Sequence, residues 1–304
     1  MRKVLILFLS FILILLLPCS LAWTENERIL YEGNSLYHYI RVSEIEGYRY
    51  LFFNRTRGIQ SAVNVRDPFE LKLPYTKASF VVSAFLDRPP VRILFIGLGG
   101  GSIPKVMAKN YPNAKIDIVE IDPDVITVAK KFFFFEPTQM MNITEMDGRL
   151  FLRRSSDFYD IIFLDAYDDV SIPFHLTTKE FFEIVKARLT PNGIVASNIW
   201  GPRNDEFYLS EVKTFQEVFP HIYMIDAISS SNYIIIAYCH DKIFTNPIIE
   251  ERIPALQRQF EFNFSLMRYA RTFEDLSGFS SDAKVLIDDF APVEILRSRK
   301  VSSE

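Results

Sequence analysis

The chain has 304 residues, and its hydrophobic content of 49%, with 14% aromatic residues, is enough for one large core or two smaller ones. A low count of 11 glycines and the lack of like-charge runs exclude a disordered or repetitive chain. The formal net charge of −4 gives no basic footprint for nucleic acid, so any preference for a cationic partner must come from a local site.

The N-terminus carries the pattern of an export signal. Arg2 and Lys3 precede the apolar stretch VLILFLSFILILLL, which has the length of a signal-peptide core and is short for a membrane span. Ser20 and Ala22 supply the small residues of a cleavage site. We predict a cleaved signal peptide over residues 1–22, with an uncleaved membrane anchor as the alternative. In both cases the positive-inside rule predicts an exported, periplasmic or extracytoplasmic protein that meets the membrane only through this segment.

Cysteine and histidine usage predicts neither a disulfide nor a metal site. After cleavage only Cys239 remains, so no intrachain disulfide can form. The four histidines show no metal-ligand spacing, and Cys239 next to His240 is typical of packing at a strand end. We therefore expect no metal.

Residues 23–88 have the pattern of a small N-terminal β-domain. From Ser35 to Val65, short runs of alternating apolar and polar residues are separated by turn residues, which predicts an antiparallel sheet of two or three strands. The segment YTKASFVVSAFL has the apolar period of a helix, and DRPP ends it. We place a domain boundary near residue 89.

Strands alternate with helices over residues 89–304. VRILFIGL, AKIDIVEID, MNITEMD, YDIIFLDA and GIVASNIW read as strands, and helical patterns separate them. The helix TTKEFFEIVKARL opens with a capping box from Thr177 to Glu180 and ends at residues 191–193. This order predicts an α/β fold with a parallel, doubly wound, Rossmann-type sheet, followed by two more strands and a mostly helical tail.

The first of these strands leads into the glycine loop GLGGGS. Gly97, Gly99 and Gly101 allow the backbone to turn into a helix N-terminus and to approach a ligand closely. A dinucleotide fingerprint needs glycine where Ser102 stands, so the G-x-G-x-G spacing favours a nucleoside without a pyrophosphate. A purely structural turn between strand and helix is the alternative.

Acidic residues stand at the ends of the next three strands. Glu120 lies about 20 residues past the glycines, where a carboxylate can bind both ribose hydroxyls. Asp147 and Gly148 follow the third strand, where a carboxylate and a backbone amide can read an adenine edge. Asp165 ends the fourth strand and begins an acidic cluster that includes Asp168. Because ligands of such sheets bind at the carboxyl ends of the strands, these residues predict a nucleoside site beside a reaction site.

The motifs GIQSAV, the glycine loop, VEID, MDG and LDAYD resemble the spermidine synthase family, aminopropyltransferases built on the class I methyltransferase fold. IPFHLTTKEFF and IDDFAPVE are similar to its bacterial branch of exported or membrane-attached synthase-like proteins. The resemblance implies aminopropyl transfer from decarboxylated S-adenosylmethionine to a diamine, no tightly bound cofactor, and a homodimer. It assigns Asp165 and Asp168 to the amine, and it places Gln60 and Tyr75 beside the donor's aminopropyl arm.

The acidic cluster fits that chemistry. A diamine is dicationic near neutral pH, because its amines have pKa values of about 10. One amine must lose a proton before it attacks, and Asp165 and Asp168 can attract the cation and accept that proton. Capping of a turn is the alternative role for Asp168.

Several positions depart from the family pattern. Gly100 stands where the family usually carries an aspartate that faces the donor's amine, and such an aspartate would repel the carboxylate of intact S-adenosylmethionine. Thr76, Ser229 and His38 stand where the family often has glutamine or tyrosine. Two alternatives therefore stay open: a methyltransferase that uses intact S-adenosylmethionine, and a non-catalytic extracytoplasmic protein that binds a polyamine or nucleoside.

Overall fold

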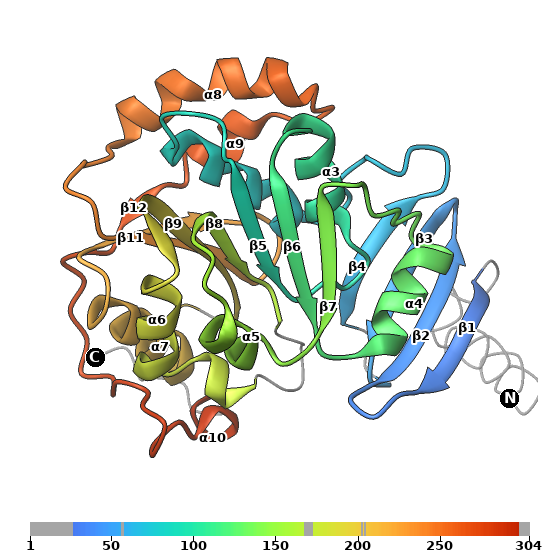
Figure 1. Cartoon of the computed structure of the whole chain (residues 1–304), viewed down its shortest axis with the longest axis horizontal. Coiled ribbons are helices and arrows are strands. Elements are labelled where there is room, and N and C mark those ends of the chain that lie inside the picture. The colour runs from blue at the N-terminus through green and yellow to red at the C-terminus, as the bar shows by residue number, and fades with distance from the viewer. Residues whose placement is uncertain (1–26, 56–57, 167–172, 202, 204, 298–304) are drawn as a thin grey trace, which may run out of the picture.

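The computed structural model (Figure 1) describes the chain over the ranges 27–55, 58–166, 173–201, 203 and 205–297. The predicted signal peptide over residues 1–22 lies outside these ranges. Within them, no helix is both long enough and apolar enough to cross a membrane. The described residues build two sheets, a small one near the N-terminus and a large one formed by the rest of the chain.

The N-terminal sheet is antiparallel and has four strands, more than the two or three predicted. In order across the sheet they are β1 (Arg28–Asn34), β2 (Tyr39–Ile45), β3 (Tyr48–Phe53) and β4 (Ile59–Asn64). Strand β1 escaped the prediction because it lies at the sheet edge with no fully buried residue, and a bulge between Ile29 and Tyr31 interrupts its alternation.

One face of this sheet packs on helix α4 (Pro123–Phe132), which Figure 1 shows beside β2 and β3. Ile40 and Val42 of β2 are fully buried in a cluster with Val125 and Val128 of the helix. Burial of such side chains stabilises the fold by roughly 1.5–3 kcal/mol each. Helix α4 therefore joins the N-terminal sheet to the large one.

The helix predicted over residues 75–86 divides into two parts. Helix α2 (Pro74–Ala78) is α-helical, and η1 (Ser79–Phe85) continues it as a 3₁₀ helix in which every residue is buried. The hydroxyl groups of Thr76 and Ser79 donate to backbone carbonyl oxygens three and four residues earlier, at 2.7 and 2.9 Å. Such bonds compete with the α-helical ladder, which accounts for the change in helix type.

The large sheet has eight strands in the order β12-β10-β11-β9-β8-β5-β6-β7. Their bounds are β5 (Arg92–Ile96), β6 (Lys115–Glu120), β7 (Met141–Glu145), β8 (Tyr159–Leu164), β9 (Leu189–Trp200), β10 (His221–Asp226), β11 (Asn232–Tyr238) and β12 (Glu274–Asp275). Strands β9, β8, β5, β6 and β7 run parallel to one another, and β11, β10 and β12 extend the sheet with antiparallel pairs. Strand order reverses between β5 and β8, and ligands of such sheets bind at that switch point.

Helices cover both faces of the large sheet (Figure 1). Besides α2, η1 and α4, the described helices are α3 (Ser102–Asn110), α5 (Gly148–Arg154), η2 (Phe174–Leu176), α6 (Lys179–Lys186), α7 (Glu206–Gln216), α8 (Asn246–Phe260), α9 (Leu266–Ala270) and α10 (Val293–Arg297), the last of which packs on α7. Phe95 of β5 belongs to the core with η1, α3, α8 and α9, and its neighbour Leu94 belongs to the core with α5, α6 and α7. The predicted doubly wound α/β fold with a small antiparallel N-terminal sheet is confirmed.

The predicted capping box of helix α6 is wrong by one residue. Thr178, rather than Thr177, is the N-cap, and its hydroxyl oxygen accepts the backbone N–H three residues later at 3.3 Å. The Glu180 carboxylate accepts the backbone N–H of Asp288 at 3.0 Å, so it holds the C-terminal segment instead. Residues 191–193, predicted to end the helix, lie within β9.

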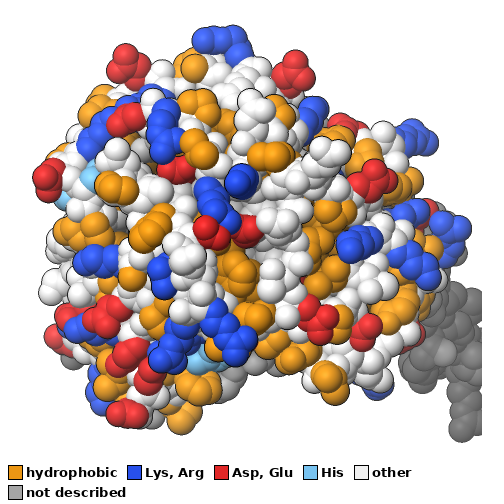
Figure 2. All heavy atoms as spheres, viewed as in Figure 1, with side chains coloured by type: hydrophobic (Ala, Val, Ile, Leu, Met, Phe, Trp, Pro, Cys, Tyr) orange, Lys and Arg blue, Asp and Glu red, His pale blue; other side chains and the backbone are white. Residues whose placement is uncertain are grey.

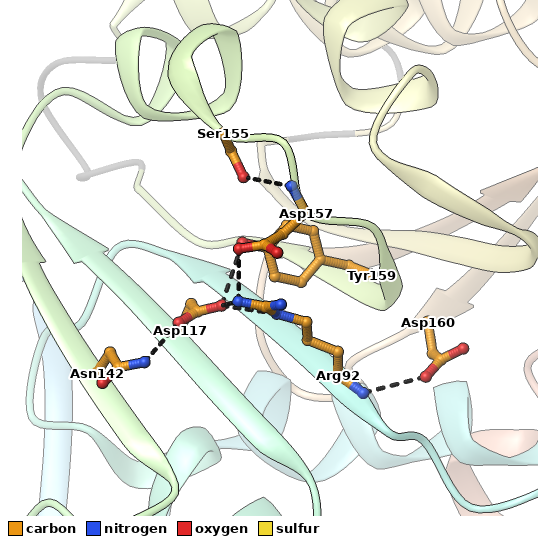
Figure 3. Close-up of polar contacts among 7 residues, drawn as sticks. All are labelled: Arg92, Asp117, Asn142, Ser155, Asp157, Tyr159 and Asp160. Atoms are coloured by element: carbon orange, nitrogen blue, oxygen red, sulfur yellow. Dashed lines mark hydrogen bonds and ion pairs between the residues drawn. The ribbon is translucent and has the colours of Figure 1, made fainter.

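Charged residues meet near the amino ends of β5, β6 and β8, at the edge opposite the switch point (Figure 3). The Arg92 guanidinium contacts the carboxylates of Asp117 and Asp157 at 3.0 and 2.6 Å. The buried Asp160 carboxylate accepts the backbone N–H groups of Val91 and Arg92 at 2.7 and 3.1 Å. These contacts tie the start of β5 to its two neighbours, at the point where the chain enters the large sheet.

Replacing Asp160 by Ala is expected to lower the free energy of unfolding by about 3 kcal/mol. Two backbone N–H groups and the guanidinium of Arg88 lose a buried acceptor. Asp157→Ala is the matched control. Its side chain is 43% exposed, so we expect a loss of at most about 1 kcal/mol. Urea unfolding gives both values, and equal losses would contradict the anchoring role of Asp160.

Candidate active site

A cavity of about 630 Å³ lies at the carboxyl ends of the parallel strands. Its walls come from the glycine loop, the ends of β6, β7, β8 and β9, and the β1–β2 turn and β4 of the N-terminal sheet. Eight of the predicted site residues line it: Gln60, Tyr75, Gly97, Gly99, Glu120, Asp147, Gly148 and Asp165. Asp168 lies outside the described residues.

The face of the molecule in Figure 2 has a mixed charge. Lys and Arg side chains are interspersed with Asp and Glu side chains, and hydrophobic side chains lie between them. This fits the mild net charge of −4. This face therefore presents no broad field of one sign to a charged ligand.

The glycine loop passes very close to the end of β8. Gly97 has φ +99°, and a Cβ atom at this position would stand 2.1 Å from the carbonyl oxygen of Asp165. The backbone N–H of Gly97 donates to the carbonyl oxygen of Val119 at 2.8 Å, which fixes the loop to β6 as well. Only glycine fits this conformation and this contact, so the close approach brings Asp165 and the loop into one site.

Gly101 is not among the lining residues, so its role in holding the nucleoside stays a prediction. It is the N-cap of α3 with φ +70°, and a Cβ atom there would meet the Phe135 ring at 2.4 Å. Gly100 is enclosed in the same way, because its Cβ would stand 2.5 Å from Ser61 Oγ and 2.8 Å from the Phe133 ring. A side chain at position 100 would require those two residues to move.

Glu120 is held firmly at the end of β6. Its Oε2 accepts the backbone N–H of Leu98, and its Oε1 accepts that of Asp122, both at 3.0 Å. Burial raises the pKa of this carboxyl group, and the two backbone hydrogen bonds oppose that shift. Each carboxylate oxygen has a second lone pair, so Glu120 can also accept hydroxyl groups from a ligand.

Asp147 has a partner that the sequence did not predict. Its Oδ1 caps helix α5 by accepting the backbone N–H of Leu150 at 2.8 Å, and its Oδ2 lies 2.7 Å from Nε2 of His175. Arg149 donates to the carbonyl oxygen of His175 at 3.1 Å and forms a two-pronged contact with Asp288 at 2.7 and 2.6 Å. The C-terminal segment thus holds the segment that closes this end of the cavity.

Asp165 is the carboxylate nearest the centre of the switch point. The side-chain amide of Asn198 donates to its Oδ1 at 2.9 Å, and the amide of Asn232 donates to Asn198 Oδ1 at 3.0 Å. The pKa of Asp165 is raised to about 7, because burial and, to a smaller extent, the charge of Glu120 raise it more than the Asn198 hydrogen bond lowers it. A carboxyl group with this pKa can exchange a proton near neutral pH.

Tyr75 and Gln60 lie on the side of the cavity that faces the N-terminal sheet. The Tyr75 hydroxyl donates to the backbone carbonyl of Gln60 at 3.1 Å, and both residues line the cavity. Burial raises the pKa of Tyr75 well above its usual value, and the negative charge of Asp165 adds to that shift. Tyr75 therefore presents a neutral hydroxyl beside the carboxylate.

Other lining residues were missed, and some of them carried a signal. Asn198 and Trp200 stand at the end of strand GIVASNIW, so the rule that located the acids could also have found them. Ser229, which the resemblance selected, is not among the lining residues, and Asn232 on the same chain segment is. His175 has no local signal, because only the fold brings it to Asp147 from 28 residues away.

Comparison with known proteins identifies relatives of this chain. A family model for the spermine/spermidine synthase domain matches residues 74–245. A polyamine aminopropyltransferase of Vibrio vulnificus (strain CMCP6) is 29% identical over 298 residues, which covers 96% of this chain and 98% of that protein. The structure of a probable spermidine synthase from Corynebacterium glutamicum matches with a TM-score of 0.71 over 88% of this chain and 99% of that chain. Its sequence identity is 20%, so it shows a common fold.

A methyltransferase shares the fold as well. The structure of human methyltransferase-like protein 13 in complex with SAH matches with a TM-score of 0.58 and 27% identity, over 64% of this chain and 95% of that one. One fold therefore serves proteins named for two different transfer reactions, and the side chains of the site must decide between them.

Proposed function

The chain belongs to the spermine/spermidine synthase family, and we propose that it transfers an aminopropyl group from decarboxylated S-adenosylmethionine to a small amine. One observation carries this proposal. The Asp165 carboxyl group, with its pKa raised to about 7, lines the same cavity as Glu120 and Asp147. A base with a pKa near the working pH is suited to deprotonate an ammonium group beside a bound nucleoside.

The donor is a co-substrate in this proposal and occupies the glycine-loop side of the cavity. Gly97 and Gly99 let the nucleoside approach the backbone. Glu120 accepts the ribose hydroxyls, and Asp147 accepts the adenine amino group. The sulfonium group then supplies an electrophilic carbon next to Asp165 and Tyr75.

The reaction is a single displacement. An ammonium group of the acceptor gives its proton to the Asp165 carboxylate, and the freed nitrogen lone pair attacks the carbon next to the sulfonium. A C–N bond forms while the C–S bond breaks, and its electron pair returns to sulfur, so a neutral thioether leaves. Fixing nitrogen and carbon at near-attack distance supplies much of the rate.

The rate should depend on the charge of Asp165. We expect kcat/KM to rise with pH through about 7, because only the deprotonated carboxyl group accepts the proton. Stability has the opposite dependence. The pKa of Asp165 in the folded chain lies above the ordinary value of about 4. Its contribution to the free energy of unfolding is therefore full below about pH 4 and is lost as pH rises through about 7. Initial rates from pH 5 to 9 test this, and a rate that is flat across pH 7 would contradict it.

The deciding experiment titrates the full-length chain with decarboxylated and intact S-adenosylmethionine by calorimetry, followed by product analysis with diamines. Tighter binding of the decarboxylated donor together with an aminopropylated product supports the proposal. If the chain binds neither donor, the proposal fails, and a binding or scaffold role would remain.

Methyl transfer is the second candidate, and the enclosure of Gly100 favours it. Position 100 is a glycine enclosed by Ser61 and Phe133. It carries no carboxylate that would repel the carboxylate of intact S-adenosylmethionine. The same calorimetry separates the two candidates. Tighter binding of the intact donor and a methylated product would replace aminopropyl transfer.

We further propose that the chain acts outside the cytoplasm. Support comes from the two basic residues and the apolar stretch that follows them within residues 1–22. Cell fractionation with mass spectrometry of the N-terminus tests this. A cytoplasmic chain that keeps Met1 and the apolar stretch would contradict it.

A further inference from the structure

We propose that Asn232 is a positioning residue for Asp165 and acts through Asn198. This inference rests on the proposed function, because it takes Asp165 as the base that deprotonates the amine. The role of Asn232 is to decide which end of the Asn198 amide faces the carboxylate. Neither asparagine takes part in the displacement itself.

The three side chains form one chain of hydrogen bonds across three strand segments. Asn198 on β9 donates its NH₂ group to Asp165 Oδ1 at 2.9 Å, and its own Oδ1 accepts the NH₂ group of Asn232 at 3.0 Å. In the antiparallel register of β9 and β11, Asn232 is paired with Trp200, two residues beyond Asn198. The two asparagines therefore lie diagonally on the same face of the sheet, within reach of each other.

A side-chain amide has a donor end and an acceptor end, and the two differ little in shape. If Asn198 turned over, its carbonyl oxygen would face Asp165 and would favour the protonated acid. In the observed arrangement the NH₂ group of Asn232 faces the carbonyl oxygen of Asn198, so turning Asn198 over would bring two NH₂ groups together and lose that hydrogen bond. The pair therefore keeps an NH₂ group directed at Asp165 and stabilises the carboxylate form.

Other groups around Asp165 act in the opposite direction. Among the described residues, the titratable side chains that interact with it are Glu120 of β6 and Tyr75 of α2. Burial and the Glu120 charge raise the pKa of Asp165, and the Asn198 hydrogen bond lowers it. Asp168 and Asp169, which follow in the sequence, lie outside the described residues. The hydrogen-bonded chain Asn232–Asn198–Asp165, called the relay below, therefore opposes burial and the Glu120 charge, which both favour the protonated acid.

The turn before β11 places Asn232 in the relay at a cost in backbone conformation. Ile228 and Ser229 have φ +32° and +68°, in the left-handed region that favours glycine. The turn is closed by the N–H of Ala227, which donates to the carbonyl oxygen of Asn232 at 3.1 Å. Strained non-glycine residues of this kind gather where a site needs a particular geometry.

The first test measures the proton affinity of Asp165 directly and does not depend on turnover. Full-length chain labelled with ¹³C at aspartate carboxyl groups is titrated by NMR, and the Asp165 signal is identified by its absence in Asp165→Asn. In Asn232→Ala and in the similarly sized Asn232→Leu, the midpoint should rise by about one pH unit. Asn232→Gln keeps the NH₂ donor, so its midpoint should stay close to the wild-type value. An unchanged midpoint in both Ala and Leu variants overturns the inference.

A matched control and a kinetic measurement complete the test. Ser230→Ala removes a contact to the backbone N–H of Asn232 but leaves the side-chain relay, so its midpoint should stay at the wild-type value. In Asn232→Ala, kcat/KM should fall about tenfold at pH 6 and change little at pH 9. An equal fall at both pH values would indicate a merely structural role. If Asp165→Asn keeps full turnover, the proposed function fails, whereas an inactive Asp165→Asn with an unmoved acid limb in the Asn232 variants refutes this inference alone.

Discussion

Replacing Asp165 by Asn is expected to lower kcat by about 10²–10⁴-fold and to leave donor binding nearly intact. The asparagine keeps the size of the side chain and an oxygen that can accept from Asn198. It cannot take a proton, so the acceptor stays an ammonium ion with no lone pair to attack. The donor contacts assigned to Glu120 and the glycine loop do not involve the changed atom. Single-turnover kinetics measures the chemical step, and calorimetry measures donor affinity.

Glu145→Gln is the matched control for this loss. Glu145 also ends a parallel strand, β7, but it is exposed and is not among the residues that line the cavity. Its replacement should leave kcat within about twofold of wild type, as surface substitutions usually do. Full activity in Asp165→Asn would remove Asp165 from the mechanism. A large loss of donor affinity would show instead that the carboxylate supports the nucleoside site.

The strand-end acids were predictable because topology and chemistry point to the same edge. A parallel sheet brings its carboxyl ends together, so Glu120, Asp147 and Asp165 had to converge once the strands were recognised. Local patterns were enough to recognise those strands, since each is a short apolar run next to a turn signal. The same reasoning predicted the glycine loop at this edge, although it could not give the 2.1 Å approach to Asp165 that makes glycine necessary at position 97.

Features that depend on distant partners could not be predicted. His175 meets Asp147 because the fold returns the segment after β8 to the end of β7, and neither residue carries a local sign of the other. Asn232 belongs to an antiparallel strand added beyond the parallel ones, where the strand-end rule does not apply. Gly101 matched the motif but packs on Phe135, because a glycine pattern does not say which side of the loop faces the ligand.

Replacing Gly97 by Ala is expected to lower kcat/KM by about 10²-fold or more. At φ +99° an added Cβ would stand 2.1 Å from the Asp165 carbonyl oxygen, so the loop or the end of β8 must move. A displacement of about 1 Å at reacting groups costs about 10²-fold. In the proposed mechanism the loop holds the donor and β8 holds the base, so either movement would separate the amine from the carbon. Steady-state kinetics with a thermal unfolding curve separates this loss from loss of the fold.

Gly99→Ala is the control that isolates the collision from backbone strain. Gly99 has φ +53°, so alanine there is also in the left-handed region, which costs about 1–2 kcal/mol. Its Cβ would find its nearest neighbour at 3.9 Å, on the Ser61 side chain, so no atom has to move. We therefore expect a larger loss of both stability and kcat for Gly97→Ala, whereas Gly99→Ala, which meets the donor in the proposed site, should mainly raise the KM of the donor. Equal turnover in the two would mean that the approach of the glycine loop to Asp165 does not set the geometry of the reaction.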